Sequence, residues 1–173
     1  TILVIPGMVE GLTPGQEVVP YDVVYERALE AISQLAAFAE ERKVAIGLEN
    51  VWNKFLLSPL EMRDFIDKIN SPFVGAYFDV GNVVLSGYPE QWIKILGKRI
   101  KKVHFKDYRR SVGTLDGFVD ILSGDVNYPA VMQSLKYVGY EGWVTAEVFT
   151  ANIHPESVLQ RASLAMDWIM AGK

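Results

Sequence analysis

Four short apolar segments of the sequence each end in one side chain that binds divalent metals well. They cover residues 44–49, 74–79, 100–104 and 143–147, and their last residues are Glu49, Asp79, His104 and Glu147. Parallel α/β barrels carry catalytic groups at the carboxyl ends of successive strands, so these four residues would meet above one point of a barrel. The donor set is rich in carboxylates, which suits Mg, Mn or Co better than a histidine-rich zinc cluster. The sequence therefore predicts a divalent-metal site.

Each of these residues also has a structural interpretation. A glutamate at a strand end can cap the following loop, and a lone histidine in an apolar strand is more often a hydrogen-bonded core residue. Asp79-Val80-Gly81-Asn82 is by itself a turn signal, although Gly81 permits close backbone approach. A buried Glu147 would be costly without a cation or donors. All four apolar segments end in a residue of a metal-binding type, which favours the metal site over four separate structural roles.

Candidate substrate-binding residues lie in the loops that follow these strand ends. Barrels often bind phosphate beside their last two strands, and a run of cations follows the histidine. A solvated loop face is the alternative for these cations, and core packing is the alternative for the nearby aromatic residues. The candidates are Trp52, Asn53, Asn82, Lys106, Arg109 and Arg110.

Strand and helix patterns alternate along the chain and would position these groups. Strands are expected at 2–5, 44–49, 74–79, 100–104 and 143–147, and helices at 23–42, 59–69, 90–96, 129–138 and 155–170. Such strand-plus-helix units form a right-handed parallel sheet with helices outside it.

Local signals support several of these boundaries. Asp22 is the expected N-cap of the first helix, and Ser58 caps the second, with Pro59 in the first turn and Glu61 closing a capping box. Gly139 is expected to end the helix at 129–138. The apolar spacing of the last helix predicts that it buries Leu159, Ala162, Met166 and Ile169.

The length of the chain limits how much of a barrel it can form. A complete (β/α)8 barrel normally needs about 250 residues, whereas this chain has 173 and opens inside a strand pattern at Thr1. We therefore expect residues 1–173 to form one domain, the C-terminal part of a TIM barrel, with about three N-terminal units outside this sequence. An open five-stranded sheet is the alternative, but it would leave apolar edges unpaired.

Composition excludes several classes of protein. About half of the residues are apolar, which predicts a globular chain with a sizeable core. The formal charge of −4 and the lack of a basic stripe argue against nucleic acid as a partner. The sequence shows no apolar stretch long enough to span a bilayer and no leader, so the expected location is the cytoplasm and the expected partner a small molecule. Without cysteine there are no disulfides or thiolate ligands.

Four segments of the chain resemble a known family. They are GLENVWNKFLLSP, YFDVGN, KKVHFKD and SGDVNYPAVMQSLKYVGYEGWVTAEV. Together they are similar to sugar phosphate isomerases and epimerases with a xylose isomerase-like TIM barrel, and the likeness covers strands four to eight of that barrel. It implies that Glu49, Asp79, His104 and Glu147 bind one divalent ion, either Mn, Mg, Co or Zn.

The resemblance also implies a reaction. In ketose 3-epimerases of the family, the metal polarises a carbonyl and stabilises a cis-enediolate, while two glutamates exchange the proton at C3. Carried over, Glu49 and Glu147 become the acid/base pair. Asn82 stands where the free-ketose epimerases have His, which resembles the L-ribulose-5-phosphate (L-xylulose-5-phosphate) 3-epimerases and favours a phosphorylated ketose. The family's outer helices commonly pair, which implies a homodimer.

Other functions remain open from the sequence. An aldose-ketose isomerase needs the same metal and proton transfer, and a dehydratase acting on an inosose uses similar enolate chemistry. Endonuclease IV shares the barrel but needs a multi-histidine zinc site, which two histidines cannot supply. A catalytically silent sugar-binding barrel is the non-enzyme alternative, and the two intact glutamates argue against it.

Overall fold

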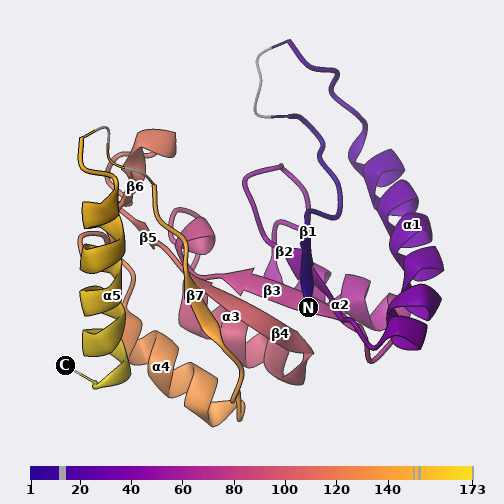
Figure 1. The fold of residues 1–173 in the computed structure, drawn as a ribbon. Helices are drawn as coiled ribbons and strands as arrows, with labels where there is room; N and C mark the ends of the chain where they lie inside the picture. The colour runs from indigo at the N-terminus through magenta and orange to yellow at the C-terminus, as the bar shows by residue number, and fades with distance from the viewer. Residues whose placement is uncertain (12–14, 150, 152, 173) are drawn as a thin grey trace. The chain divides into compact units, whose positions relative to one another are not determined.

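Five strands form one sheet in the structure, a computed structural model that describes residues 1–11, 15–149, 151 and 153–172. The sheet order is β1-β2-β3-β4-β7, and the pairs β1–β2, β2–β3 and β4–β7 are parallel. The strands are Ile2–Val4, Ile46–Glu49, Val74–Asp79, Ile100–Phe105 and Val144–Ala146. All five strands fall inside or within one residue of the expected segments (Figure 1).

In the described part of the chain, five α-helices alternate with these strands, as the sequence predicts. They are α1 (Tyr21–Arg42), α2 (Pro59–Ile69), α3 (Pro89–Leu96), α4 (Tyr128–Tyr137) and α5 (Glu156–Met170). Short 3-10 turns, η1 (Gly81–Val83), η2 (Gly97–Arg99) and η3 (Leu115–Gly117), add to them.

The long loop after β4 contains a second sheet that the sequence analysis did not predict. β5 (Asp107–Tyr108) pairs antiparallel with β6 (Phe118–Val119). Two residues per strand are too few for an alternation of apolar and polar residues to be visible in the sequence.

The chain divides into two compact units. The first comprises Thr1–Phe78 and Ile95–Lys102, and the second comprises Asp79–Lys94 and Val103–Lys173. Within the first unit, α1 buries Val24, Ala28, Ile32, Ala36 and Ala39, and every residue of β2 is buried. This is the pattern of a parallel strand covered on both faces.

Two helix starts in the first unit test the expected caps. Asp22 is wrong as the N-cap of α1, because the helix begins at Tyr21 and the cap position is Pro20. Ser58 is confirmed, since its Oγ accepts the N–H of Glu61 at 3.1 Å. The Glu61 carboxylate accepts the N–H of Leu57 at 2.9 Å, one residue before the position that a capping box predicts.

In the second unit, α4 begins at a side-chain cap in which Asn127 Oδ1 accepts the N–H of Ala130 at 3.1 Å. Gly139 follows its end with a φ of 70°, a left-handed conformation that glycine adopts without a steric penalty. α5 buries Val158, Ala162, Ala165 and Ile169. The expected burial of Leu159 is wrong, because its side chain is 69% exposed. The expected burial of Met166 is wrong too, because it lies beside the buried row and is only half-buried.

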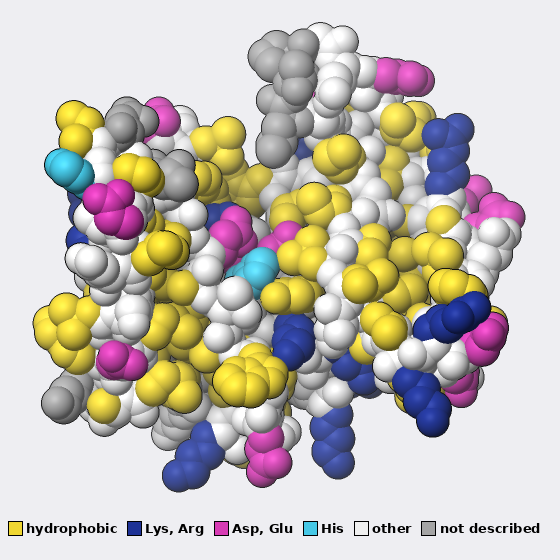
Figure 2. Space-filling model, in the orientation of Figure 1, with side chains coloured by type: hydrophobic (Ala, Val, Ile, Leu, Met, Phe, Trp, Pro, Cys, Tyr) yellow, Lys and Arg dark blue, Asp and Glu magenta, His cyan; other side chains and the backbone are white. Residues whose placement is uncertain are grey.

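The described surface mixes charged and apolar side chains. In the face drawn in Figure 2, Lys and Arg side chains are separated by acidic and apolar ones. None of the helices in the described part of the chain is long and apolar enough to cross a membrane.

Candidate metal centre

Three of the four predicted ligands lie together at strand ends in the second unit. The N–H of Val80, which follows Asp79, donates to the carbonyl of His104 at 3.2 Å. The N–H of Glu147, which follows β7, donates to the carbonyl of Phe105 at 2.9 Å. These backbone bonds place the last residue of β3, the end of β4 and the residue after β7 side by side.

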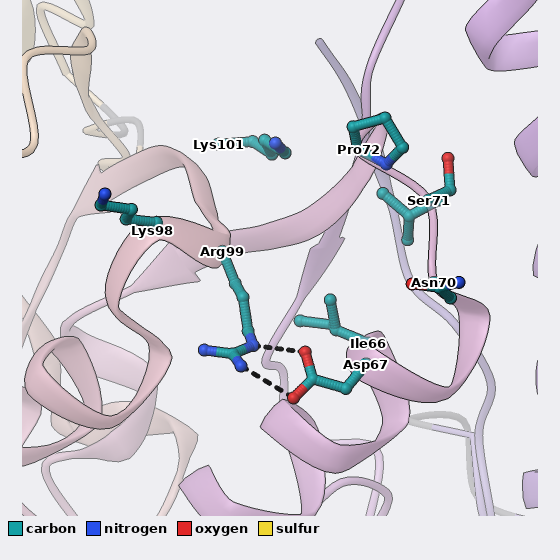
Figure 3. A pocket seen from close by; sticks show the side chains of 9 residues that line it. Ile66, Asp67, Asn70, Ser71, Pro72, Lys98, Arg99 and Lys101 are labelled. Atoms are coloured by element: carbon teal, nitrogen blue, oxygen red, sulfur yellow. Dashed lines mark hydrogen bonds and ion pairs between the residues drawn. The ribbon is translucent and has the colours of Figure 1, made fainter.

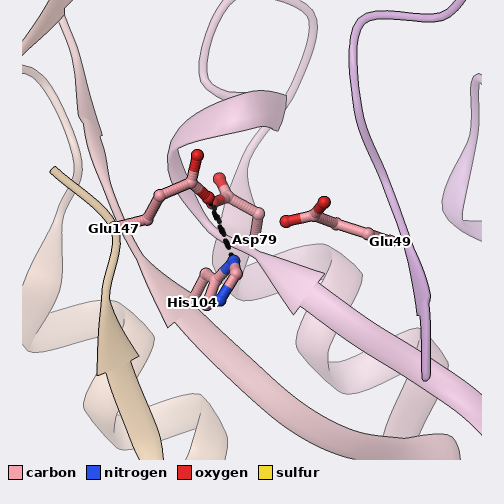
Figure 4. Close-up of side chains that lie close together, drawn as sticks. All are labelled: Glu49, Asp79, His104 and Glu147. Carbon is pink, nitrogen blue, oxygen red and sulfur yellow. Dashed lines mark ion pairs between the residues drawn. The ribbon is translucent and has the colours of Figure 1, made fainter. Parts of the chain in front are cut away.

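The side chains of Asp79, His104 and Glu147 converge (Figure 4). Nδ1 of His104 lies 3.0 Å from Oε2 of Glu147 and 3.9 Å from Oδ2 of Asp79. Each of the three offers a ligand atom, and these atoms lie within 4.8 Å of one another. The structure therefore brings these three nitrogen and oxygen donors together, and their role as metal ligands stays a prediction.

The chemistry of this cluster fits a divalent cation. The side chain of Asp79 is fully buried, and its Oδ1 accepts the N–H of Asn82 at 2.7 Å. A buried carboxylate beside a second carboxylate is costly unless positive charge compensates it. Carboxylate oxygens with one imidazole nitrogen form a donor set that Mg, Mn, Co and Zn accept.

Lys106 supplies one positive charge to the cluster. Its Nζ donates to Oε1 of Glu147 at 2.7 Å, while Oε2 of the same carboxylate faces His104. The hydrogen bond from His104 is the largest cause that lowers the pKa of Glu147 to about 2, with Lys106 adding to it and burial opposing it. Glu147 is therefore ionised at neutral pH, which is the state required of a ligand or a base.

Glu49, the fourth predicted ligand, belongs to the first unit. It is the last residue of β2 and is 7% exposed. In the β2–β3 register it is paired with Tyr77, which lies two residues before Asp79 on β3. Paired residues of parallel strands, and residues two apart on one strand, share a face of the sheet. Glu49 and Tyr77 thus lie on the same face of the sheet in the first unit. Figure 4 labels Glu49 with the three ligands predicted in the second unit, and its role as a ligand stays a prediction.

The predicted substrate-binding residues of the first unit lie in the loop after β2. Trp52 is half-buried, and Asn53 is 3% exposed. The Asn53 amide holds this loop, because Nδ2 donates to the carbonyl of Gly7 at 2.5 Å and Oδ1 accepts the N–H of Phe55 at 3.1 Å. A substrate role for Trp52 and Asn53 stays a prediction.

The other predicted substrate-binding residues lie in the second unit and differ in exposure. Asn82 is buried next to Asp79, whose carboxylate accepts its N–H, and Lys106 is buried against Glu147. Arg109 and Arg110 are exposed. Nη2 of Arg109 donates to the carbonyl of Ser123 at 2.9 Å, whereas Nε of Arg110 donates to the carbonyl of Val84 at 2.9 Å.

Sequence reasoning missed the residues that enclose Lys106. The ammonium lies 4.5 Å from the ring centroid of Phe118 and 5.6 Å from that of Phe149, both within the range of cation–π attraction. The neighbouring Asp107 carboxylate accepts the N–H groups of Tyr108, Gly124 and Val126, which folds the loop back on itself. Phe118 lies in the two-residue strand β6 and Phe149 follows β7, so neither ring belongs to a periodic pattern that would select it from the sequence.

A larger cavity lies at the opposite end of β3 and is not a candidate centre. Its volume is about 710 Å³, and its lining comes from the end of α2, the segment that leads into β3, and the basic residues Lys98, Arg99 and Lys101 (Figure 3). Arg99 in its wall donates to both carboxylate oxygens of Asp67, at 2.5 and 2.7 Å. The exposed carbonyl groups at the C-terminus of a helix carry a partial negative charge, and basic side chains nearby compensate this charge. Parallel barrels act at the other, carboxyl end of their strands.

Comparison of the sequence with known families identifies the class of protein. The profile described as xylose isomerase-like TIM barrel matches residues 1–170. The chain therefore belongs to this family, which confirms the predicted family and the predicted TIM barrel, of which the five strand–helix units form a part.

Two curated relatives resemble the chain at low identity. The uncharacterized protein MJ1311 of Methanocaldococcus jannaschii is 28% identical over 130 residues, which cover 72% of this chain and 43% of that protein. An inosose dehydratase of Lacticaseibacillus casei is 25% identical over 172 residues, which cover 86% of this chain and 56% of that protein. The chain thus spans about half the length of these relatives.

Two solved structures share the fold. A D-tagatose 3-epimerase-like protein superposes with a TM-score of 0.75 at 22% identity, over 98% of this chain and 62% of that one. The IOLI protein, solved with a bound zinc atom, gives a TM-score of 0.77 at 20% identity, over 92% of this chain and 60% of that one. At these identities the likeness concerns the fold.

Proposed function

We propose that the chain carries the metal-dependent proton-transfer site of a sugar epimerase or isomerase that acts on a ketose or a ketose phosphate. The observation that carries this proposal is the convergence of Asp79, His104 and Glu147 at strand ends of a xylose isomerase-like barrel. Glu49, the last residue of β2, is the fourth predicted ligand, and its inclusion rests on the resemblance of the sequence to the family. A divalent ion bound by these four residues would supply Lewis acidity to a carbonyl oxygen of the sugar.

The protein's own residues then divide the remaining work. Glu147 is held in its ionised form and is oriented through both oxygens, which suits a base. In a 3-epimerisation Glu147 and Glu49 form the pair that removes the proton from C3 on one face and returns a proton on the other. Asp79 and His104 serve as ligands, and Lys106 orients Glu147.

The experiment that tests the reaction follows hydrogen exchange in heavy water. The protein with Mn is incubated with a panel of free and phosphorylated ketoses, and proton NMR records which hydrogen is lost. Exchange at C3 is the expected result, because the proposed base acts there. Exchange at C1 would replace the epimerase with an aldose-ketose isomerase, and no exchange with any ketose would refute both.

Substitution of Glu147 tests its role directly. Glu147→Gln keeps the size but removes the base, so we expect exchange to fall by about a hundredfold or more. Glu141→Gln is the matched control, because Glu141 is exposed in the turn before β7. Exchange at the unsubstituted rate in Glu147→Gln, with the fold intact by circular dichroism, would contradict the mechanism.

Metal binding is measured separately by calorimetry with Mn²⁺. Asp79→Asn removes the charge of the most deeply buried carboxylate in the cluster, so the Kd should rise by about tenfold or more. An unchanged Kd would remove Asp79 from the ligand set.

A dehydratase is the second candidate function. It is favoured by the inosose dehydratase of Lacticaseibacillus casei, which aligns with 86% of this chain. Dehydration begins with the same removal of a proton next to a carbonyl, and then eliminates a hydroxyl group. Incubation with an inosose separates the two functions, because the dehydratase forms a product lighter by one water in the mass spectrum.

A further inference from the structure

A small cavity in the second unit lies beside the loops that follow β3 and β4. Its volume is about 200 Å³, and its lining comprises residues 84–88 and Arg110. Val84 lies five residues after Asp79, and Arg110 lies six residues after His104. A water molecule occupies about 30 Å³ in the liquid, so the cavity has room for one phosphoryl group with a few waters.

Arg110 is anchored in the wall of this cavity. Its Nε donates to the carbonyl of Val84 at 2.9 Å, and its guanidinium lies 5.3 Å from the centroid of the Tyr88 ring. Its backbone N–H donates to Oδ2 of Asp125 at 2.7 Å. The two terminal amino groups of the guanidinium have no protein partner among the residues that the structure describes. A planar cation held by its stem with free terminal donors is suited to bind two oxygens of one anion.

The residues on the other side of the cavity add to this preference. α3 begins at Pro89, directly after Tyr88, so the partial positive charge of its N-terminus lies next to the lining. Ser86 contributes a hydroxyl group, and its N–H is bonded to the carbonyl of Val83 at 3.2 Å. The first turn of α3 also contains an acidic side chain, Glu90, which does not line the cavity. The charged side chain in the lining is that of Arg110.

Arg109, the neighbouring cation, has different surroundings. It does not line the cavity, and its Nη2 donates to the carbonyl of Ser123 at 2.9 Å. The two arginines were equivalent candidates in the sequence, and the structure separates them. Arg109 is therefore a matched control for Arg110, with the same charge at the adjacent position.

We propose that the cavity at Arg110 binds the phosphate group of the sugar, so that the substrate class is a ketose phosphomonoester. This inference rests on the proposed function and deepens it. The cavity follows β3 and β4, the two strands that carry the predicted metal ligands Asp79 and His104. The phosphate and the metal-bound carbonyl of one sugar phosphate would therefore bind at the same end of the second unit.

The first test measures binding of inorganic phosphate by calorimetry. Arg110→Ala should raise the Kd of phosphate by about tenfold or more, because a charge-assisted bidentate contact is lost. Arg109→Ala should leave the Kd within about twofold. Arg110→Lys keeps the charge without the planar fork and should fall between the two. Equal effects of the two alanine variants would overturn the assignment of the cavity.

The second test compares KM for a ketose phosphate and for the free ketose in the exchange assay. Arg110→Ala should raise KM for the phosphorylated sugar by about tenfold and leave KM for the free sugar unchanged. If Arg110→Ala weakens the binding of inorganic phosphate but leaves KM for the phosphorylated sugar unchanged, the site binds free phosphate. The assignment of the substrate class is then overturned. If no ketose exchanges while phosphate binding depends on Arg110, the proposed function fails and the anion site stands.

Discussion

Removal of the Lys106 ammonium should uncouple Glu147 from its main cationic partner. Lys106→Met keeps most of the aliphatic stem and deletes the charge that lies 2.7 Å from Oε1 of Glu147. The side chain of Lys106 is 9% exposed and that of Glu147 is 37% exposed, so the pair is neither a surface ion pair nor a fully buried one.

The magnitude follows from this geometry. Two unit charges 2.7 Å apart attract by about 6 kcal/mol at an effective dielectric constant of about 20. Desolvation of the ammonium opposes this attraction, and water at the partly exposed carboxylate screens it. A net coupling of about 1–2 kcal/mol is therefore expected, in the range of hydrogen bonds to charged groups.

A double-mutant cycle measures this coupling. Lys106→Met, Glu147→Gln and the double variant are unfolded in urea with a chelator present, and tryptophan fluorescence gives each free energy of unfolding. Glutamine keeps a hydrogen-bond acceptor, so the cycle reports mainly the attraction between the charges. A coupling below about 0.3 kcal/mol would refute the assigned ion pair.

The same variant changes the titration of Glu147. In Lys106→Met the pKa of Glu147 should rise from about 2 but stay below its usual value of 4.5, because the hydrogen bond from His104 is the larger cause. Carbon-detected NMR of the carboxyl group follows this titration. An unchanged pKa would show that Lys106 does not act on Glu147 in solution.

Three further predictions concern stability and metal binding. The folded pKa of Glu147 lies below its unfolded value, so its contribution to stability is complete above pH 4.5 and should be lost as the pH falls towards about 2; Glu147→Gln should flatten this part of the stability curve. Gly81→Ala should lower Tm and weaken Mn²⁺ binding, since its Cβ would lie 2.7 Å from the backbone oxygen of Lys106, whereas Gly87→Ala, with 3.4 Å to its nearest neighbour, is the control. Ser58→Ala should lower the free energy of unfolding by about 1 kcal/mol in urea, because the N-cap of α2 is lost.

The repeating elements were predictable because their signals are local. α2 has the bounds that the sequence predicts, since its cap, its proline and its apolar spacing all lie within residues 58–69. The strand end at Asp79 was also readable, because an apolar run stops at this polar residue. The end expected at His104 is correct to within one residue, since β4 continues to Phe105. Parallel topology then brings these ends together without any further information from the side chains.

The contacts that set the chemistry of Glu147 were not predictable in this way. Lys106 was expected to bind phosphate because it stands in a cationic loop, and its partner Glu147 lies 41 residues further along the chain. A phosphate role for Lys106 stays a prediction. The predicted burial of Leu159 was wrong because apolar spacing fits two adjacent rows of α5, and tertiary packing buries the row of Val158. A sequence gives the type of each side chain, but distant contacts decide which charge faces which.

The position of Lys106 explains how this site tolerates its own negative charge. Asp79 and Glu147 lie close together, and a carboxylate pair at this distance would normally raise the pKa of one member. Here Glu147 stays ionised because one oxygen faces His104 and the other accepts the Lys106 ammonium. The Phe118 ring lies 4.5 Å from that ammonium and reduces its access to water. Under the proposed function, Lys106 thus keeps Glu147 ionised for a role as ligand or base. Arg110, which is exposed and lines a separate cavity, belongs to the proposed phosphate site.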